Sequence, residues 1–440
     1  MRFALAIFAL LAAACGGGDS ESTIPGKESS VSQGEGLQER VRWLARQRGL
    51  DGIPDGVDDA VLPPGDSPIA RLGQLLFFSR TLSMDYDVAC ATCHHPLLAG
   101  SDGLSLPVGV AAQTPYQLGP GRSVDAPLDK DPSSDCAAAM VAPCGPNVAR
   151  NSQTVFNSGL YRNALFHDGR IQVVGAAPDG APLVRTPESS VSAIPMDQSG
   201  LLFHQAQEPL VASREMRGFG HAEMTSDAIR KRLVDRFLGI EPPGQDYVTE
   251  QEAAVWTEYF TAAFPEMPEQ DRISLKTIQT ALAAYQKSLT FVQTPWSRFI
   301  RGESDLGETA LRGAELFWAN VEEGGLGCYK CHSGDLHTDE SFHNVGFPQI
   351  GRGKRSDGSD PGRQGVTRRE EDSHKFRTPA LHNVRLTAPY GHAGSFQTLE
   401  EAIRWHASPL RGVLDQSWSG LEQFKNDELL SRYPQALTLT

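Results

Sequence analysis

Apolar residues recur with helical spacing in several stretches of this chain, while strand-like alternation is sparse. Ala70–Phe77 and Ala310–Phe317 each show the apolar period of a short amphipathic helix. A third stretch keeps the same period through Ile278, Ala281, Leu282, Tyr285 and Leu289. The pattern therefore predicts a mainly α-helical fold.

A fourth helix is predicted near the C-terminus by its start signal. Thr398 and Glu401 have the spacing of a capping box. Leu399, Ala402, Ile403 and His406 then fall at i, i+3, i+4 and i+7, on one face of a helix. A single histidine on an apolar face is more often a core residue than a ligand, so both roles stay open for His406 at this point.

The two amphipathic stretches at 70–77 and 310–317 both lead into a Cys-x-x-Cys-His run. A repetition at so long an interval predicts duplicated domains rather than a short repeat. We place these domains at residues 39–297 and 298–440. Pro, Gly, Ser and Asp are frequent in residues 100–150 and 171–200, which predicts long loops, and in the link Gln293–Glu308.

The N-terminus has the pattern of a targeting segment. Arg2 precedes the apolar run Phe3–Leu11, and three alanines lead to Cys15. The run is too short to span a bilayer and predicts a signal peptide over residues 1–14. The segment resembles a bacterial lipoprotein signal, in which the cysteine is acylated; plain secretion and a buried helix are the alternatives. Residues 15–38 contain much Gly, Ser and Glu and predict a flexible tether.

Composition narrows the classes of function. The chain has 54 Asp and Glu against 40 Lys and Arg, a formal net charge of −14, which argues against nucleic acid as a partner. Hydrophobic residues make up 40% of the chain, enough for a packed core. Seven cysteines are too few for a disulfide scaffold at this length, so their spacing matters more than their number.

Two cysteine runs carry the strongest chemical signal. Cys90-Ala-Thr-Cys93-His94 and Cys328-Tyr-Lys-Cys331-His332 both fit the attachment pattern of a c-type haem. Two thiols one helical turn apart can bond both vinyl groups of a porphyrin, and the adjacent histidine then lies under the iron. A redox Cys-x-x-Cys or half of a zinc site are the alternatives, but no second ligand pair follows either run. The sequence predicts two covalently bound haem c groups.

With these motifs in view, the chain resembles the bacterial di-haem cytochrome c peroxidase / MauG superfamily from about residue 40 to 420. The shared motifs beyond the haem runs follow one another in the family's order. They are Arg150–Thr154, Phe166–Arg170, Pro209–Met216, Phe376–Leu381 and Leu386–His392. The resemblance implies two cytochrome-c-like haem domains with long loops, the first peroxidatic and the second transferring electrons.

The resemblance also implies roles above the first haem, which His94 binds. Family members that reduce peroxide carry a catalytic glutamate at the position of Glu215 and a glutamine at that of Gln205. A glutamate above an open iron can carry a proton between the two oxygens of peroxide. A solvated helix charge is the alternative for Glu215. Some peroxidases of the family hold a removable distal histidine in the loop after the first haem, where this chain has Leu106–Ala111. Because no histidine lies between His95 and His167, the resemblance implies a first iron that is five-coordinate or water-ligated.

At the second haem, bound by His332, the resemblance raises a ligand question. Peroxidases of the family use methionine there, and MauG uses tyrosine. Met267 is the last methionine of this chain, and the aligned position is His406. Bis-histidine ligation would favour oxidised iron, since methionine raises the haem potential. Bis-histidine ligation would therefore favour a MauG-like function.

Three further expectations come from the resemblance. His167 stands where relatives carry a tryptophan as an inter-haem relay, with a structural role in the loop as its alternative. Asn151, with the backbone carbonyls of Thr387 and Pro389, matches an inter-haem calcium site, and oxygen ligands suit calcium. Turn capping is the alternative for Asn151. His392 matches a histidine near the second haem and is expected to be structural, with a direct ligand role as the alternative.

The remaining cysteines, Cys136 and Cys144, lie in the loop after the first haem run. In an exported protein they are expected to form a disulfide, with free thiols as the alternative. The chain ends at Thr440, where relatives usually continue into another helix.

The sequence thus predicts an exported di-haem oxidoreductase on the periplasmic side of a bacterial envelope, anchored through lipid at Cys15. It would reduce hydrogen peroxide at the first haem with electrons from a small c-type cytochrome. A MauG-like enzyme that uses peroxide-oxidised haems to modify side chains of a partner protein is the alternative. A non-enzymatic electron carrier is the second alternative.

Overall fold

The computed structural model describes residues 33–54, 57, 63–123, 146, 148–189, 193–240, 248–351, 353–355 and 358–408. The described chain divides into two compact units. The smaller unit contains the described residues before 61, Phe291–Ser341 and Thr378–His382, and the larger unit contains the others.

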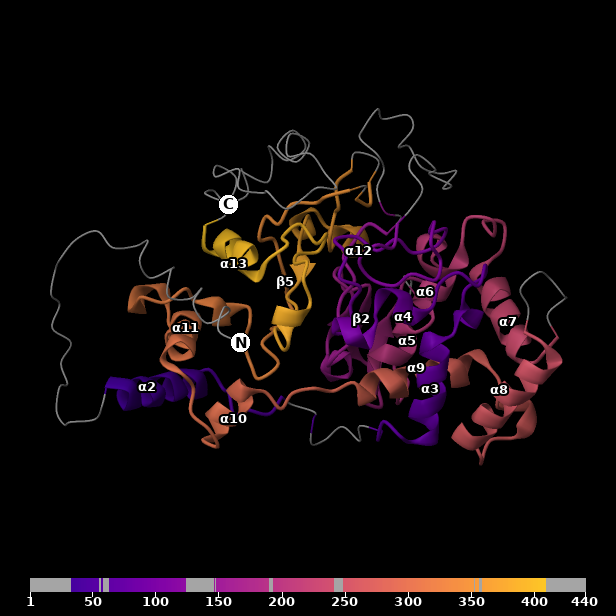
Figure 1. Ribbon diagram of the computed structural model, residues 1–440, viewed down its shortest axis with the longest axis horizontal. Helices are drawn as coiled ribbons and strands as arrows, with labels where there is room; N and C mark the ends of the chain where they lie inside the picture. The colour runs from indigo at the N-terminus through magenta and orange to yellow at the C-terminus, as the bar shows by residue number, and fades with distance from the viewer. Residues whose placement is uncertain are drawn as a thin grey trace. The chain divides into compact units, whose positions relative to one another are not determined.

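The smaller unit is built around a short helical core. Its α-helices within the described residues are α2 (Gln33–Gln47), α10 (Pro295–Arg301) and α11 (Glu308–Trp318). Figure 1 shows α2 beside α11, and Val41, Leu44, Phe299, Leu311 and Trp318 are buried between the helices.

This core explains two differences from the predicted organisation. Residues 33–38, expected in the tether, begin α2, whose apolar face packs against α10 and α11. The link predicted at Gln293–Glu308 contains α10, because Thr294 caps the helix by accepting from Ser297 N–H and Pro295 occupies its first turn. Residues 39–54 therefore group with 291–341, whereas the sequence had suggested that they belong to one domain over residues 39–297.

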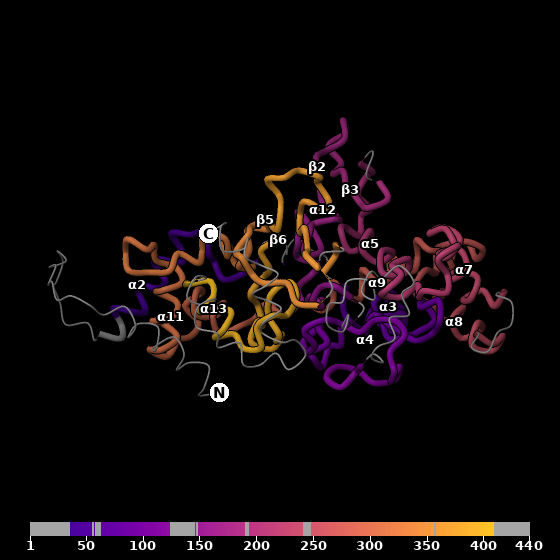
Figure 2. Tube along the Cα trace, turned by 90° about the horizontal axis from the view of Figure 1, so that it is seen from above, coloured from indigo at the N-terminus to yellow at the C-terminus, as the bar shows by residue number. Residues whose placement is uncertain are grey.

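The larger unit has a helical core with small sheets, which confirms the mainly α prediction (Figures 1 and 2). Its helices are α3 (Pro68–Phe78), α4 (Cys90–Cys93), α5 (Leu201–Gln205), α6 (Glu208–Val211), α7 (Ser226–Phe237), α8 (Glu250–Ala263), α9 (Leu275–Ser288), α12 (Gln364–Thr367) and α13 (Leu399–Ala407).

The helices α3 and α9 lie side by side at the centre of this unit and carry the apolar stripes predicted from the sequence (Figure 1). Gly73 makes the close crossing possible. A Cβ atom at this position would lie 1.9 Å from the carbonyl oxygen of Ala281, so no larger residue fits. Ser274 caps α9 by accepting from Thr277 N–H.

The segment 171–200 is not the long loop that we predicted. It contains β2 (Ile171–Ala176), β3 (Pro182–Arg185) and β4 (Ile194–Pro195), which form an antiparallel sheet with β1 (Ala164–Leu165) in the order β1-β2-β3-β4. Pro178-Asp-Gly180 makes the turn between β2 and β3, and Gly180 has a positive φ of 87°. The Pro and Gly content that suggested a loop is the content of a hairpin. A second, two-stranded sheet pairs β5 (Phe342–His343) with β6 (Phe376–Arg377).

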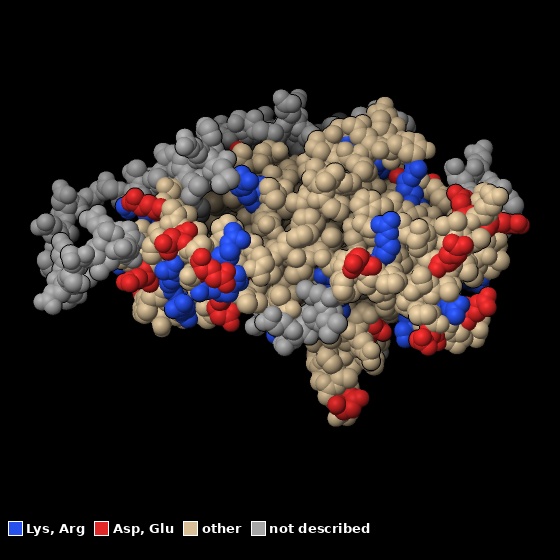
Figure 3. All heavy atoms as spheres, turned by 60° about the horizontal axis from the view of Figure 1, so that its bottom comes forward, with Lys and Arg blue, Asp and Glu red and all other residues tan. Residues whose placement is uncertain are grey.

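Two surface features bear on the expected partners. Within the described residues, no helix has both the length and the apolar character needed to cross a membrane. On the described part of the face drawn in Figure 3, acidic and basic side chains are interspersed without a broad patch of one sign.

Candidate functional site

The first Cys-x-x-Cys-His run forms a single helical turn in the larger unit. Ala89 N–H donates to Thr92 Oγ1 over 2.9 Å at the start of α4, and His94 N–H donates to the carbonyl of Cys90 over 3.0 Å at its end. Cys90 and Cys93 are free thiols, and burial raises the pKa of Cys90 to about 12. Two unpaired thiols one turn apart fit attachment to one porphyrin.

The ring of His94 is oriented by backbone carbonyls. Its Nδ1 lies 2.9 Å from the carbonyl oxygen of Gln153 and 3.3 Å from that of Gly100. A carbonyl oxygen only accepts hydrogen bonds, so Nδ1 carries the proton and Nε2 carries the lone pair. Burial also lowers the pKa of His94, which favours the neutral ring. This is the form in which histidine binds a metal.

The second run has the same features in the smaller unit. The turn is the 3-10 helix η8 (Cys328–Lys330), and His332 N–H donates to the carbonyl of Cys328 over 3.0 Å. His332 Nδ1 faces the carbonyl oxygen of His337 at 3.1 Å, which again puts the lone pair on Nε2. Burial raises the pKa of the Cys328 thiol to about 11.

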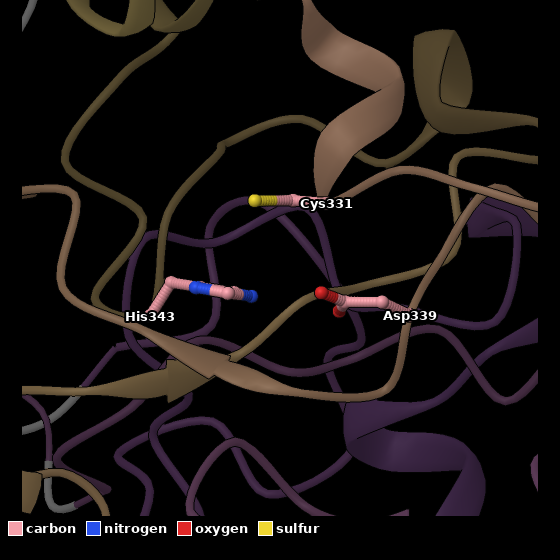
Figure 4. Close-up of side chains that lie close together, drawn as sticks. All are labelled: Cys331, Asp339 and His343. Atoms are coloured by element: carbon pink, nitrogen blue, oxygen red, sulfur yellow. The ribbon is translucent and has the colours of Figure 1, made fainter.

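The Cys331 thiol of this run has an acidic neighbour. Asp339 N–H donates to the carbonyl of Cys331 over 2.8 Å, and the carboxylate lies near the sulfur (Figure 4, which also labels His343 of the larger unit). Burial, followed by the charge of Asp339, raises the pKa of Cys331. The thiol is therefore neutral, a form that is compatible with attachment to a haem vinyl group.

Glu215 lies on a backbone turn that is fixed from both sides. The turn is π-helical (η5, Ser213–Arg217), a form that is rare and often marks functional sites. The carbonyl of Arg214 accepts from Val110 N–H at 3.2 Å, and that of Met216 accepts from Met84 N–H at 2.9 Å.

The charge of Glu215 acts on the first haem run. It raises the pKa of His94, against the larger effect of burial, and that of Cys93, together with the larger effects of burial and Asp102. Both effects are electrostatic and weaken with distance. The role of Glu215 above the first haem stays a prediction.

Gln205, the second residue predicted above the first haem, is the last residue of α5. Its Oε1 lies 3.5 Å from Nε2 of Gln286, a buried residue of α9. Gln279 of the same helix donates to the carbonyl of Phe203 over 3.1 Å. The position of Gln205 is therefore set by two contacts between α5 and α9.

The stretch from 106 to 110 is the one in which some relatives hold a removable histidine. Here its apolar members, Leu106, Val108 and Val110, are buried. Beside it a hollow of about 500 Å³ is lined by Asp85, Asp87, Val110, Ala111, Gly218, Phe219 and Gly220. The hollow opens next to the turn that carries Glu215.

Asn151 joins the residues predicted for the relay and for calcium. Its carbonyl accepts from His167 Nε2 at 3.1 Å, and its N–H donates to the carbonyl of His392 at 2.8 Å. The side-chain Nδ2 donates to the carbonyls of Leu104 and Ser105, at 2.8 and 3.2 Å.

Burial and the Arg150 charge lower the pKa of His167 to about 3, so this imidazole is neutral. His392 stacks on Phe376 with ring centroids 3.8 Å apart, in a buried position that fits a structural role. Thr387 Oγ1 donates to the carbonyl of Val384 over 3.1 Å.

The C-terminal helix α13 confirms the predicted capping box. Thr398 accepts from Glu401 N–H, and Glu401 accepts in turn from Thr398 N–H at 2.9 Å. The buried residues are Ala402 and Trp405, while His406 is exposed, with Nδ1 facing the carbonyl oxygen of Ala402 at 2.9 Å. His406 is thus not a core residue, and its ring has the tautomer seen for His94 and His332. Cys15, Cys136 and Cys144 lie outside the described residues.

A buried ionic cluster was not anticipated from the sequence. Arg150 donates to both carboxylate oxygens of Asp360, at 2.7 and 2.8 Å, and to Asp168 at 2.6 Å. Arg170 Nε adds a bond of 3.1 Å to Asp168. Arg150, Asp168 and Arg170 lie in recognisable motifs, but Asp360 comes from a Gly- and Ser-rich loop that gives no signal of its own.

The chain is similar to several known proteins along most of its length. A family model described as "Di-haem cytochrome c peroxidase" matches residues 67–305. The methylamine utilization protein MauG of Methylophilus methylotrophus is 28% identical over 358 residues, which is 81% of this chain and 77% of that protein. Cytochrome c551 peroxidase of Pseudomonas aeruginosa is 25% identical over 374 residues, or 85% and 80%. The crystal structure of a MauG-like protein associated with microbial copper homeostasis has a similar fold, with a TM-score of 0.51, 24% identity and coverage of 78% and 77%.

Proposed function

Because the chain belongs to the di-haem cytochrome c peroxidase family and is an oxidoreductase with two c-type haems, we propose that it reduces hydrogen peroxide at the first haem. Electrons would come from a small c-type cytochrome and pass through the second haem. Because the members of this family are enzymes, the alternative of a non-enzymatic electron carrier is not supported. The observation that carries the proposal is the pair of Cys-x-x-Cys-His turns, in each of which a backbone carbonyl holds the histidine ring with its lone pair on Nε2.

The residues that would hold the two haems fit the group. Cys90, Cys93 and His94 would hold the first, and Cys328, Cys331 and His332 the second, with His406 as a further ligand there. When bound, the haems supply irons that accept and donate electrons. The carbonyls that face His94 and His332 fix each ring with its lone pair on Nε2.

Glu215 would transfer a proton between the two oxygens of peroxide. Its carboxylate would accept the proton of one peroxide oxygen and return it to the other, so that this oxygen leaves as water. Gln205 would donate a hydrogen bond to the oxygen species at the same place. The hollow beside Val110 and Gly218 would be the entry for peroxide.

A second candidate function is a MauG-like modification of a partner protein. One observation favours it: Met267 is the last methionine in the sequence, and the position aligned with the ligand of the second haem is His406. Bis-histidine ligation through His332 and His406 would lower the potential of the second haem and make it a poorer acceptor from a high-potential cytochrome.

One experiment separates these functions. The ferric holoprotein is mixed with hydrogen peroxide in the presence of a reduced small c-type cytochrome. Rapid cytochrome oxidation is expected, with a loss of about 10²–10⁴-fold in Glu215→Gln, the usual range for a general acid–base residue. Glu223→Gln, an exposed residue of the same unit, is the control and should keep the wild-type rate.

The outcomes are distinct. If the wild-type protein consumes peroxide without oxidising the cytochrome, the MauG-like function is favoured. If Glu215→Gln keeps the wild-type rate, the catalytic role of Glu215 is wrong.

Three further parts of the proposal concern the site and the location of the protein. Calcium bound at Asn151 with the carbonyls of Thr387 and Pro389 would hold the segment around Asn151, whose own carbonyl accepts from His167. A disulfide between Cys136 and Cys144 would stiffen the loop after the first haem run. Export with lipid at Cys15 would place the protein on the periplasmic side of the envelope. Mass spectrometry of the mature protein tests the last two, since acylation and disulfide formation each change the mass.

A further inference from the structure

Two tryptophans of the smaller unit stack beside the second haem run. Trp296 of α10 and Trp318 of α11 have ring centroids 5.9 Å apart and ring planes within 8° of parallel. This is an offset stack, in which the two π systems overlap in part. Trp318 is buried and Trp296 is half-buried. We call these two residues the indole pair.

The indole pair lies within a short path of the proximal ligand. Trp318 stacks on Tyr329, a residue of the Cys-x-x-Cys-His run itself, with centroids 6.5 Å apart. The ring of His337 lies 5.8 Å from Trp318 and 6.5 Å from Trp296, and its carbonyl accepts from His332 Nδ1. Aromatic rings and one hydrogen bond therefore connect His332 to both indoles.

The surroundings favour a positive charge on the indole pair over one on Tyr329. The guanidinium of Arg48 lies 4.2 Å above the Tyr329 ring, and a cation at this distance opposes removal of an electron from it. Oxidised tyrosine also needs a base for its proton, whereas Tyr329 donates to the amide oxygen of Asn320.

Trp296 differs from Tyr329 both in whether a cation is recorded over its ring and in the partner of its proton. No guanidinium is recorded over its ring among the described residues, and its Nε1 is buried without a hydrogen-bond partner. The indole proton therefore stays in place when an electron leaves. Sharing of the charge between two parallel rings stabilises the cation further.

We propose that the indole pair is a redox-active site that supplies an electron to the second haem when peroxide oxidises the enzyme and no external donor is present. This inference rests on the proposed peroxide chemistry. Hydrogen peroxide takes two electrons from the enzyme and two protons from the solvent and becomes two water molecules. One electron comes from the haem pair and one from the indole pair, which becomes a cation radical and keeps its protons.

The test uses the ferric holoprotein with two kinds of oxidant. In one arm, hydrogen peroxide is added without a donor, and electron paramagnetic resonance records organic radicals. In the other arm, flash-generated tris(bipyridine)ruthenium(III) oxidises the protein in the absence of peroxide. The variants are Trp296→Phe and Trp318→Phe, and the former loses no hydrogen bond. Trp256→Phe is the matched control, since this half-buried α8 residue packs on Phe237 in the larger unit.

We expect an indole radical in both arms, its loss in both variants of the indole pair and its retention in Trp256→Phe, with equal haem content throughout. A radical that persists in Trp296→Phe and Trp318→Phe, or that is also lost in Trp256→Phe, overturns the inference. Peroxide consumption, measured in the same mixtures, tests the proposed function separately. If peroxide is not consumed, that function fails, while the ruthenium arm still decides whether the indole pair is oxidised.

Discussion

His167 Nε2 donates to the backbone carbonyl of Asn151 over 3.1 Å, so the residue in the relay position and the residue in the calcium position are bonded to each other. The bond fixes the orientation of a neutral imidazole whose pKa burial lowers to about 3. A neutral imidazole is harder to oxidise than an indole. If His167 relays electrons, its ordered imidazole is therefore a weaker bridge than an indole at the same position would be.

The first prediction follows from this contact. His167→Trp should raise the rate of electron transfer between the haems, because an indole replaces the imidazole and its N–H can still donate. His167→Gln should lower the rate, since it keeps a donor for Asn151 but removes the ring. Stopped-flow absorbance of the two haems after mixing with a reduced cytochrome measures both. If neither change alters the rate, electrons take another route.

The second prediction concerns His406. If its Nε2 binds the second iron, His406→Met should convert the spectrum of the second haem to the histidine–methionine type and raise its reduction potential. Absorption spectra and a redox titration of the holoprotein measure these changes. His221→Gln, which changes a histidine paired with Asp85 in the same unit, is the control. An unchanged spectrum in His406→Met would falsify the ligand assignment.

The extent to which the sequence predicted this structure depends on how local the signals are. α13 and α9 were predicted because Thr398, Glu401 and the apolar stripe through Ile278 lie within one or two turns. The hairpin at 171–185 was missed because its turn residues were interpreted as a loop. The grouping of α2 with α11 was missed because it depends on packing between segments that are far apart in the chain. Val41 and Trp318, for example, belong to one buried hydrophobic cluster.

The same distinction applies to the site. Each haem run is contiguous in the sequence, so both haem sites were predicted from the residues themselves. The roles of Glu215 and Gln205 were predicted only from a resemblance. The neighbours that hold them, Val110, Met84 and Gln286, come from three other segments. No periodicity or spacing indicates such contacts, because they are set by tertiary packing.

The third prediction tests the ionic cluster behind Asn151. Asp360→Asn should reduce the free energy of unfolding by about 3–5 kcal/mol, because it leaves the buried Arg150 with an incomplete set of charge partners. Chemical denaturation at neutral pH measures the loss. Asp66→Asn, at an exposed position, is the control and should change stability by no more than about 0.5 kcal/mol. A loss no larger than that of the control would contradict a stabilising role for the pair.

The same ionic cluster makes the stability of the folded protein depend on pH. Burial would raise the pKa of Asp360, but the hydrogen bonds and charge of Arg150 outweigh it and hold the pKa below the usual 3.8. The stabilisation is therefore fully present above pH 3.8 and is lost as the pH falls toward the lower folded pKa. Asp360→Asn should flatten the acid side of the stability curve, which thermal melts between pH 2 and 5 would measure.

The fourth prediction concerns Glu208, a residue of α6 between Gln205 and Glu215. Its Oε1 is buried without a hydrogen-bond partner among the described residues. Burial, and then the charge of Glu188, raise the pKa of Glu208 from 4.5 to about 7. Arg170 and Arg230 oppose this rise, and Glu215 adds to it.

The sign of the linkage follows from the raised pKa. Between pH 4.5 and 7 the folded state holds a proton that the unfolded state has lost, so stability falls as the pH rises through this interval. Ionised Glu208 would then cost about 1–3 kcal/mol above pH 7. Glu208→Gln stays neutral in both states, so it should be more stable than the wild type at pH 8 and nearly equal at pH 4. Denaturation at the two pH values, with Glu223→Gln as control, measures the difference. Equal effects of Glu208→Gln at both values would mean that Glu208 ionises in the folded protein as it does in water.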